Sequence, residues 1–254
     1  MSITLHDACL PKGLRVYALG DVHGDHAAAS AMLARLRRDL AARPVADWRE
    51  IWIGDLIDRG PDSAGVLDLA LRDETREKRI VLLGNHDAYL RDFLATGDST
   101  ILSPWLTYGG VQSCASWGID RLTLNETIDR HGASGLRDML EARVPERQWR
   151  LVEEMPTHAV LGDFLFVHAG IRPGIALDAQ DPRDLIWIRG NFLDHAEPHS
   201  HVVVHGHTPS PEIEMMPNRI GIDTGAGKGG HLSCLVLEGD AVGHLTEEGV
   251  VSLL

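Results

Sequence analysis

Cysteine is scarce in the sequence. The three cysteines, Cys9, Cys114 and Cys234, are odd in number and form no Cys-x-x-Cys pair. Neither a disulfide framework nor a cysteine-based zinc site is therefore expected, and a reducing compartment is favoured. The sequence also starts without a basic leader, and no apolar run approaches the ~20 residues that span a bilayer. We therefore expect a cytoplasmic location and no membrane partner.

Positive charge is scarce as well. Across 254 residues there are 24 lysines and arginines against 37 aspartates and glutamates, which gives a net charge of −13 with histidine neutral. This balance disfavours a nucleic-acid partner, because binding along a phosphate backbone needs a broad basic surface. An acidic protein can still bind one phosphate ester where metal cations and a few arginines supply the charge locally.

Strand and helix patterns alternate in the first half of the chain. Strands are expected at 14–19, 50–54 and 79–84, and helices at 26–42, from Pro61 onward and at 88–95. Such alternation is typical of parallel β-α-β units in an α/β fold.

The second half of the chain has a different pattern. Residues 99–156 are predicted to be a mostly helical insert. Beyond it, Gly162-Asp163 and Gly239-Asp240 each separate two strand patterns and suit the turn of a hairpin, which predicts a second, mixed or antiparallel sheet. Because no linker and no internal repeat interrupts the chain, we expect residues 1–254 to form a single domain.

Five short motifs follow predicted strands, at the end where open α/β sheets bind ligands. They are GDVHGD at 20–25, GDLIDRGPDS at 54–63, GNHD at 84–87, FVHAGIRPG at 166–174 and VVVHGHTPSP at 202–211. Each alone could be ordinary turn chemistry, since Gly, Asn and Asp are common turn residues. Their joint placement at five strand ends favours one shared site.

The residue types in these motifs suit metal ions. Asp21 and His23 stand two positions apart at a strand end, so their side chains point to one side and can share a metal. Asp55 is placed like Asp21, and Asn85 offers a neutral carbonyl oxygen. Carboxylate, amide and imidazole ligands without thiolate favour Mn²⁺, Fe or Zn. Two ions would share a bridging carboxylate, and hydrolysis by a metal-bound hydroxide would follow.

Two other features are interpreted as structural. The segment 225–230, GAGKGG, matches a dinucleotide-binding fingerprint but leads into a strand pattern rather than a helix, so a nicotinamide or flavin site is rejected. His195, His199 and His201 lie in a polar stretch that we interpret as a solvated loop.

Taken in order from 20 to 209, the five motifs resemble the phosphoprotein phosphatase family of the calcineurin-like metallophosphoesterases, in particular its bacterial and phage branch. The resemblance extends to DLIWIRGNF at 184–192 and to PNRIGIDTGAGKGG at 217–230. It implies a four-layer α/β/β/α sandwich of two mixed sheets flanked by helices, with a two-metal site between the sheets.

The resemblance also implies a role for each motif residue. Asp21 and His23 would bind one metal, Asp55 would bridge, and Asn85, His168 and His207 would bind the other. His86 would be the catalytic acid, oriented by Asp58, and Arg59, Arg189 and Asn85 would bind the phosphate. Manganese is the metal we expect first, with Fe, Zn, Ni or Co compatible with the same ligands. His207, rather than His205, occupies the family's ligand position.

The substrate is the open question at this point. The leading hypothesis is a phosphatase acting on phosphoserine, phosphothreonine or phosphotyrosine in proteins, or on small phosphoesters. The alternative is a symmetrical diadenosine tetraphosphate hydrolase, because GNHD with Asp87 also occurs in that family. Best-known members of that family resemble GDLVARGP in the second motif, whereas this chain keeps Asp58 in GDLIDRG.

The helical insert is expected to discriminate between these substrates. A pocket with stacking aromatic rings and extra arginines would suit an adenosine, whereas an open, shallow cleft would suit a peptide. Trp105, Tyr108 and Trp117 are candidate stacking residues, but core packing is the role that we expect for each. A non-catalytic interaction module on the same fold is a further alternative, but its signature would be lost ligands, and every ligand is present here.

Overall fold

The first sheet has six strands in the order β11-β10-β9-β1-β2-β3. The computed structural model describes residues 2–254, so Met1 lies outside the described part of the predicted domain. The strands are β1 Leu14–Leu19, β2 Asp47–Trp52, β3 Arg79–Val81, β9 Cys234–Glu238, β10 Ala241–Leu245 and β11 Val250–Ser252. β1, β2 and β3 are parallel, as the alternating pattern predicts.

The second sheet has five strands in the order β4-β5-β6-β8-β7. They are β4 His158–Leu161, β5 Phe164–Val167, β6 Val202–His205, β7 Glu214–Met216 and β8 Arg219–Gly221. The β4-β5 hairpin turns at Gly162-Asp163 as predicted. The hairpin of β9 and β10, by contrast, joins the first sheet, where β9 lies antiparallel to β1. Turn chemistry fixes the local pairing of two strands, but it does not determine which sheet they join.

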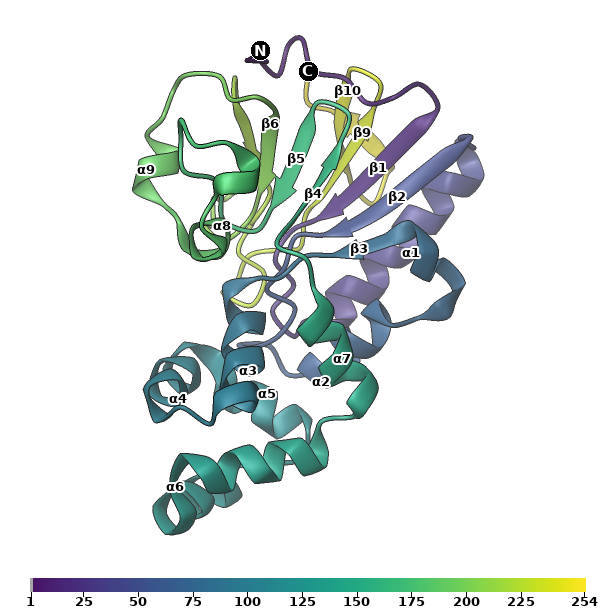
Figure 1. Ribbon diagram of the computed structural model, residues 1–254. Helices are drawn as coiled ribbons and strands as arrows, with labels where there is room; N and C mark the ends of the chain where they lie inside the picture. Colours follow the sequence, from purple (N-terminus) through teal and green to yellow (C-terminus); the bar gives the residue numbers. More distant parts are fainter. Residues whose placement is uncertain (1) are drawn as a thin grey trace.

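The two sheets pack face to face, with helices on their outer faces (Figure 1). Along β1, Val16 and Ala18 face the second sheet, whereas Tyr17 and Leu19 face the helices. A strand buried on both faces explains why residues 14–19 form an almost continuous apolar run. On the other side, Leu165 of β5 packs against two short helices, α8 Pro182–Trp187 and α9 Gly190–Leu193. The four-layer α/β/β/α sandwich is therefore confirmed.

The helices of the first half flank the first sheet. They are α1 His26–Ala42, α2 Ser63–Ala70, the 3₁₀ turn Asp73–Lys78 and α3 Asn85–Thr96. α3 begins three residues before the predicted Ala88, because the Asp87 side chain accepts the backbone N–H of Gly84 and closes the first turn. This early start places Asn85 and His86 at the helix N-terminus.

The predicted helical insert is observed at the end of the sandwich nearest α2 and α3 (Figure 1). It comprises α4 Ser99–Trp105, a π-helical turn Leu106–Gly110, α5 Val111–Ser116, α6 Arg121–Arg143 and α7 Glu146–Glu154. Trp105 and Trp117 are buried in its core, which confirms core packing for both, whereas Tyr108 is 55% exposed, so the expectation of core packing is wrong for that residue. The single-domain organisation itself stays a prediction.

The segment with three histidines is only partly a solvated loop. His199 is buried, and its ring stacks on Phe192 at 5.9 Å and on His195 at 5.1 Å between centroids. The solvated-loop interpretation is therefore wrong for His199, which helps to cover the outer face of the second sheet. Within residues 2–254, no helix combines the length and hydropathy needed to cross a membrane.

Candidate functional site

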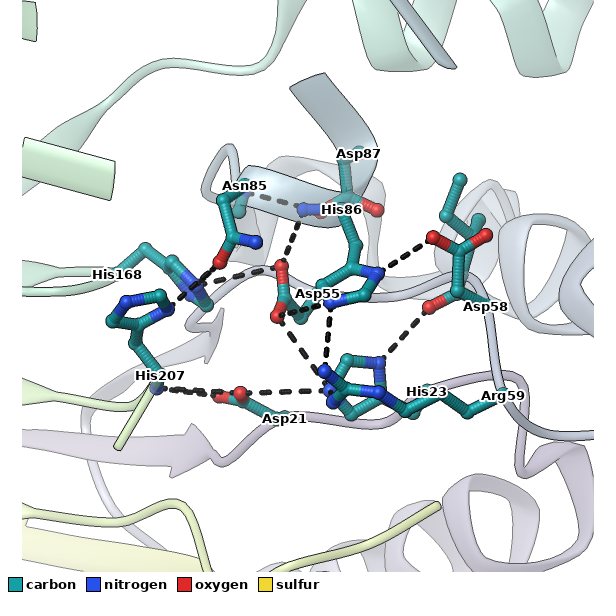
Figure 2. A network of polar contacts seen from close by, with 12 residues as sticks. Asp21, His23, Asp55, Asp58, Arg59, Asn85, His86, Asp87, His168 and His207 are labelled. Carbon is teal, nitrogen blue, oxygen red and sulfur yellow. Dashed lines mark hydrogen bonds and ion pairs between the residues drawn. The ribbon is translucent and has the colours of Figure 1, made fainter. Parts of the chain in front are cut away.

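The five motifs meet in space, although up to 186 positions separate their residues (Figure 2). Three of them follow β1, β2 and β3 in the first sheet, and two follow β5 and β6 in the second. The carboxyl ends of these parallel strands lie at the same end of the sandwich. The loops that follow them therefore bring their polar side chains together.

The backbone of the site is unusual. Five non-glycine residues between positions 2 and 254 have a positive φ: His23, Asp55, Asp58, Arg59 and His207. All five are residues that the sequence predicts for the site. A positive φ in a non-glycine residue costs roughly 1–3 kcal/mol and persists where the surrounding structure imposes it, as in functional sites.

Asp55 lies at the centre of the site. Its carboxylate is 3.5 Å from His23 Nε2 and 3.4 Å from His168 Nε2, and it accepts the backbone N–H of His86 at 2.9 Å. Two groups that could hold a metal ion both contain it: His23, Asp55 and His86 form one, and Asp55, His168 and His207 form the other. Asp55 is thus placed to be shared by two ions.

The remaining predicted ligands adjoin these groups. Asn85 Oδ1 lies 2.7 Å from His207 Nδ1 and 3.0 Å from His168 Nε2. Asp21 accepts the backbone N–H of His207 at 3.2 Å, and its Oδ2 lies 3.8 Å from His23 Nε2. Gly206 is required here, because a Cβ at this position would overlap the Asp21 carboxylate. The structure therefore brings all six predicted ligands together.

His205 does not join them. Its ring packs edge-on against Phe192 with 5.1 Å between centroids, and burial lowers its pKa to about 4. His205 is the last residue of β6, whereas His207 lies beyond the strand and has a positive φ, so the alternation of the strand does not extend to it. The structure thus agrees with the choice of His207 over His205.

Burial keeps the ligand histidines neutral. It lowers the pKa of His23 to about 3 and, together with His168, lowers that of His207 to about 2. The pKa of His168 is also lowered by burial. A neutral imidazole has the lone pair that a metal ion binds.

The carboxylates of the site repel one another. Burial, then Asp223 and Asp55, raise the pKa of Asp21 well above its ordinary value. Burial also raises the pKa of Asp55, but the neighbouring histidines, His168 first, outweigh that effect and hold the pKa low. Buried carboxylates beside neutral imidazoles are a donor set that suits divalent cations. The residues present therefore fit a two-metal centre.

His86 is paired with a buried carboxylate. Its Nδ1 lies 2.6 Å from Asp58 Oδ2, and Asp58 is fully buried. The other Asp58 oxygen accepts hydrogen bonds from Ser113 Oγ at 2.6 Å and from Trp105 Nε1 at 3.0 Å. Burial alone would lower the pKa of His86, but Asp55 and Asp58 outweigh it and raise that pKa. The arrangement agrees with the predicted acid and its orienting residue.

Sequence reasoning missed Ser113, and it considered Trp105 only for stacking or core packing. Both belong to the helical insert, about 50 positions from Asp58, and neither follows a strand. No local motif marks them, because their contribution is to hold Asp58 rather than to bind a ligand. The insert therefore forms part of the site's support.

The two predicted phosphate-binding arginines lie at opposite ends of the ligand set. The Arg59 guanidinium contacts His23 Nε2 and lies 2.8 Å from His86 Nε2. Arg189 Nε donates to His207 Nε2 at 3.0 Å. Positive charge is thus present at each end of the centre, where it can bind phosphate oxygens.

Asp87 has a structural position. It is fully buried and accepts the backbone N–H groups of Leu56 and Gly84, which ties the second motif to the third. Burial and repulsion by Asp55 raise its pKa to about 7. Its contacts are to backbone, so they provide no direct information about the substrate.

A pocket of about 560 Å³ opens beside Asn85. Tyr89 and Trp187 line it with their rings 5.5 Å apart, and Trp187 lies 6.0 Å from the ring of His207. Arg91 and Arg183 also line the pocket. These four residues were missed by sequence reasoning, which looked for stacking rings in the insert alone. The position of Trp187 two residues before Arg189 is the one local signal that could have indicated it.

Comparisons with known proteins agree with this geometry. A family model described as calcineurin-like phosphoesterase matches residues 14–244. An asymmetrical bis(5′-nucleosyl)-tetraphosphatase of Anoxybacillus flavithermus is 26% identical over 239 residues, which cover 85% of this chain and 88% of that protein. Serine/threonine-protein phosphatase 1 of Salmonella typhimurium is 38% identical over 95 residues, which cover 37% of this chain and 38% of that protein.

A solved structure supports the fold. The cold-active protein-tyrosine phosphatase of a psychrophilic Shewanella species superposes with a TM-score of 0.61 at 17% identity. The match covers 96% of this chain and 83% of that one. At such an identity the likeness concerns the architecture, and it includes the region of the helical insert.

Proposed function

This chain belongs to the calcineurin-like phosphoesterase family of hydrolases, and from that premise we propose that it hydrolyses the phosphoanhydride chain of dinucleoside tetraphosphates. This choice of substrate departs from the leading sequence hypothesis, a protein phosphatase. It adopts the alternative that GNHD left open.

The pocket beside Asn85 is the observation on which the proposal rests. A nucleotide base can stack on an aromatic ring, and Tyr89 and Trp187 provide two rings next to the ligand His207. Arg91 and Arg183 add the positive charge that phosphates attract. A phosphoserine side chain has no group of that size or shape beyond its phosphate. The pocket therefore favours a nucleotide ester.

The relatives support the same choice. The asymmetrical tetraphosphatase of Anoxybacillus flavithermus aligns along most of both chains, whereas the serine/threonine phosphatase aligns over 95 residues. An alignment over 239 residues includes regions outside the metal motifs, where substrate choice is decided.

The metal ions would be held by the residues of the two groups around Asp55. Asp21, His23 and Asp55 would bind one ion, and Asp55, Asn85, His168 and His207 the other. When bound, two divalent cations supply Lewis-acid stabilisation of phosphoryl oxygens and lower the pKa of water. The identity of the metals is a proposal, with Mn²⁺ the first candidate.

The side chains of the protein supply the other parts of the reaction. Arg59 and Arg189 bind the equatorial phosphoryl oxygens from the two ends of the centre. His86, held by Asp58 and facing the centre with Nε2, donates a proton to the leaving phosphate. Because Ser113 and Trp105 occupy the second Asp58 oxygen, the carboxylate is fixed in the orientation that keeps His86 in place.

A phosphoprotein phosphatase is the second candidate, and Asp58 favours it. The sequence keeps an aspartate where best-known symmetrical diadenosine tetraphosphate hydrolases have GDLVARGP, and this aspartate contacts His86. The same centre would then act on phosphoserine or phosphothreonine, with the pocket holding part of a peptide.

Steady-state kinetics distinguish the two candidates. Chelator-stripped protein resupplied with Mn²⁺ would be given diadenosine tetraphosphate, phosphoserine and phosphothreonine peptides, and p-nitrophenyl phosphate. We expect kcat/KM for the dinucleotide to exceed that for the peptides at least tenfold, and the nucleotide products to show which anhydride bond breaks. The reverse preference would overturn the proposal in favour of the second candidate. Asp55→Asn controls for contaminating hydrolases.

A further inference from the structure

The glycine-rich segment 225–230 lies directly against the metal-ligand residues. A Cβ on Gly227 would overlap the side chain of His23 and contact that of Arg59, so a glycine is required there. Gly225 and Gly227 have φ of +82° and +74°, in the left-handed region that glycine adopts readily. The backbone of the segment therefore lies against His23, with no room for a side chain between them.

The segment is held in one conformation. The backbone N–H groups of Lys228 and Gly230 both donate to the carbonyl of Gly225 at 2.9 Å. The Asp223 carboxylate accepts the N–H of Gly225 at 2.9 Å, and Thr224 Oγ1 donates to the carbonyl of His231 at 2.6 Å. The prediction that this segment leads into a strand and not into a helix is confirmed, because the tight turn is followed by β9.

Lys228 stands at the tip of this turn as a free cation. Its side chain is exposed, and no carboxylate among residues 2–254 lies within ion-pair distance of it. Burial and then repulsion by Arg59 lower the pKa of Lys228, and attraction by Asp223, Asp21 and Asp55 opposes that shift. The hydrogen bonds of the turn hold the backbone of Lys228 next to Gly227, and therefore beside the centre.

Lys228 and the aromatic pocket lie on different sides of the centre. The pocket adjoins Asn85 and His207, whereas the turn adjoins His23 and Arg59. Figure 2 shows these two pairs at opposite sides of the shared Asp55. A substrate that fills the pocket and places one phosphoryl group at the centre would therefore extend its remaining phosphates toward the turn.

We infer that Lys228, carried by the turn 225–230, binds the phosphates of a polyphosphate chain that lie beyond the phosphoryl group under attack. The inference rests on the proposed function and deepens it. A lysine acts as a compact point charge on a flexible stem, which suits phosphates whose position varies with chain length. In a protein of net charge −13, one such cation near the centre attracts a polyanion where the surface as a whole repels it.

The test compares substrates that differ in their phosphates. Diadenosine tetraphosphate has phosphates beyond the scissile bond, whereas p-nitrophenyl phosphate has a single phosphoryl group. Lys228→Met removes the charge and keeps the length of the side chain, and Lys228→Arg restores the charge. Lys12→Met is the matched control, because Lys12 is exposed and precedes β1 at the opposite end of the strand.

We expect Lys228→Met to lower kcat/KM for the tetraphosphate about tenfold, mostly through KM, as the loss of one charged hydrogen bond does. The loss should exceed the loss on p-nitrophenyl phosphate at least about fivefold, and Lys228→Arg should recover most of it. Binding of a methylene-bridged, non-hydrolysable diadenosine tetraphosphate, measured by calorimetry, should weaken by a similar factor.

Each failure has its own signature. Equal losses on both substrates, or no loss of affinity for the analogue, would overturn the role of Lys228 while leaving the proposed function in place. If the unmodified protein preferred phosphopeptides to the tetraphosphate, the proposed function itself would fail, and the Lys228 variants would then change neither substrate selectively.

Discussion

The centre and its surroundings are built in different ways. At the centre, the ligands follow strands within five short motifs, all are buried, and five of the residues have a positive φ. Around it, the pocket and the turn 225–230 contribute side chains that are partly or fully exposed and come from separate segments. The candidate catalytic residues are therefore each marked by a short motif after a strand, whereas the pocket proposed for the substrate is lined by Tyr89 and Trp187, which lie outside those motifs.

The largest expected effect comes from breaking the centre. Asp55→Asn removes the carboxylate that both groups share, so the protein should lose both bound ions. Because the charge stabilisation supplied by each ion raises the rate roughly 10²–10³-fold, loss of both ions should lower turnover at least about 10⁴-fold. Elemental analysis would measure the metal content, and the release of phosphate would measure the rate of turnover. Retention of two ions would contradict the bridging role, and Asp138→Asn on α6 serves as the control.

The second prediction separates an acid from a ligand. His86 lies within one of the groups that could hold a metal, yet it is also paired with Asp58. His86→Ala should lower kcat roughly 10²–10⁴-fold with metal content unchanged, since a general acid contributes about that much. Loss of an ion together with the activity would make His86 a ligand.

The third prediction concerns the pocket. Tyr89→Leu should lower kcat/KM for diadenosine tetraphosphate roughly tenfold, because stacking of a base contributes about 1–3 kcal/mol. Arg183→Gln should lower it by a similar factor, because it removes a positive charge that attracts phosphates. The ratio to p-nitrophenyl phosphate should fall in both variants. Arg130→Gln, an exposed substitution on α6, should leave the ratio unchanged. An unchanged ratio for Arg183→Gln and Tyr89→Leu would mean that the nucleoside binds elsewhere.

The smallest expected effect links the insert to the centre. Ser113→Ala removes one hydrogen bond to the Asp58 carboxylate and one of two acceptors of the Asp58 backbone N–H, which keeps Ser63 Oγ as the other. The bond from Trp105 stays in place. We expect kcat to fall about 3–10-fold, since one hydrogen bond contributes about 0.5–1.5 kcal/mol, with KM and metal content unchanged. A change in KM with an unaltered kcat would show that the insert acts on substrate binding and not through Asp58.

The same contrast explains what could be predicted from the sequence. The strand at 14–19 and the helix at 26–42 were predicted with their observed bounds, because the spacing of apolar residues and the residues that cap a helix are local signals. The candidate metal ligands could be named from the sequence because each motif follows a predicted strand. Placement of β9 and β10 could not be predicted, since a hairpin carries no signal for the sheet it joins.

The aromatic residues of the proposed substrate pocket had no sequence signal comparable to the five motifs. Tyr89 and Trp187 are about 100 positions apart, and they form one pocket wall only because α3 and α8 meet beside the centre. Trp105 and Trp117, candidate stacking rings for which core packing was expected, are buried. Aromatic residues occur both in protein cores and in binding pockets, so residue type alone does not predict in which of the two a given ring lies.

The most direct test of this account is a crystal structure of the metal-loaded protein with a methylene-bridged, non-hydrolysable diadenosine tetraphosphate. We expect one adenine in the pocket against Tyr89 and Trp187, a phosphate between Arg59 and Arg189, and the remaining phosphates at Lys228. An adenine bound elsewhere, with the pocket beside Asn85 filled by solvent, would contradict it.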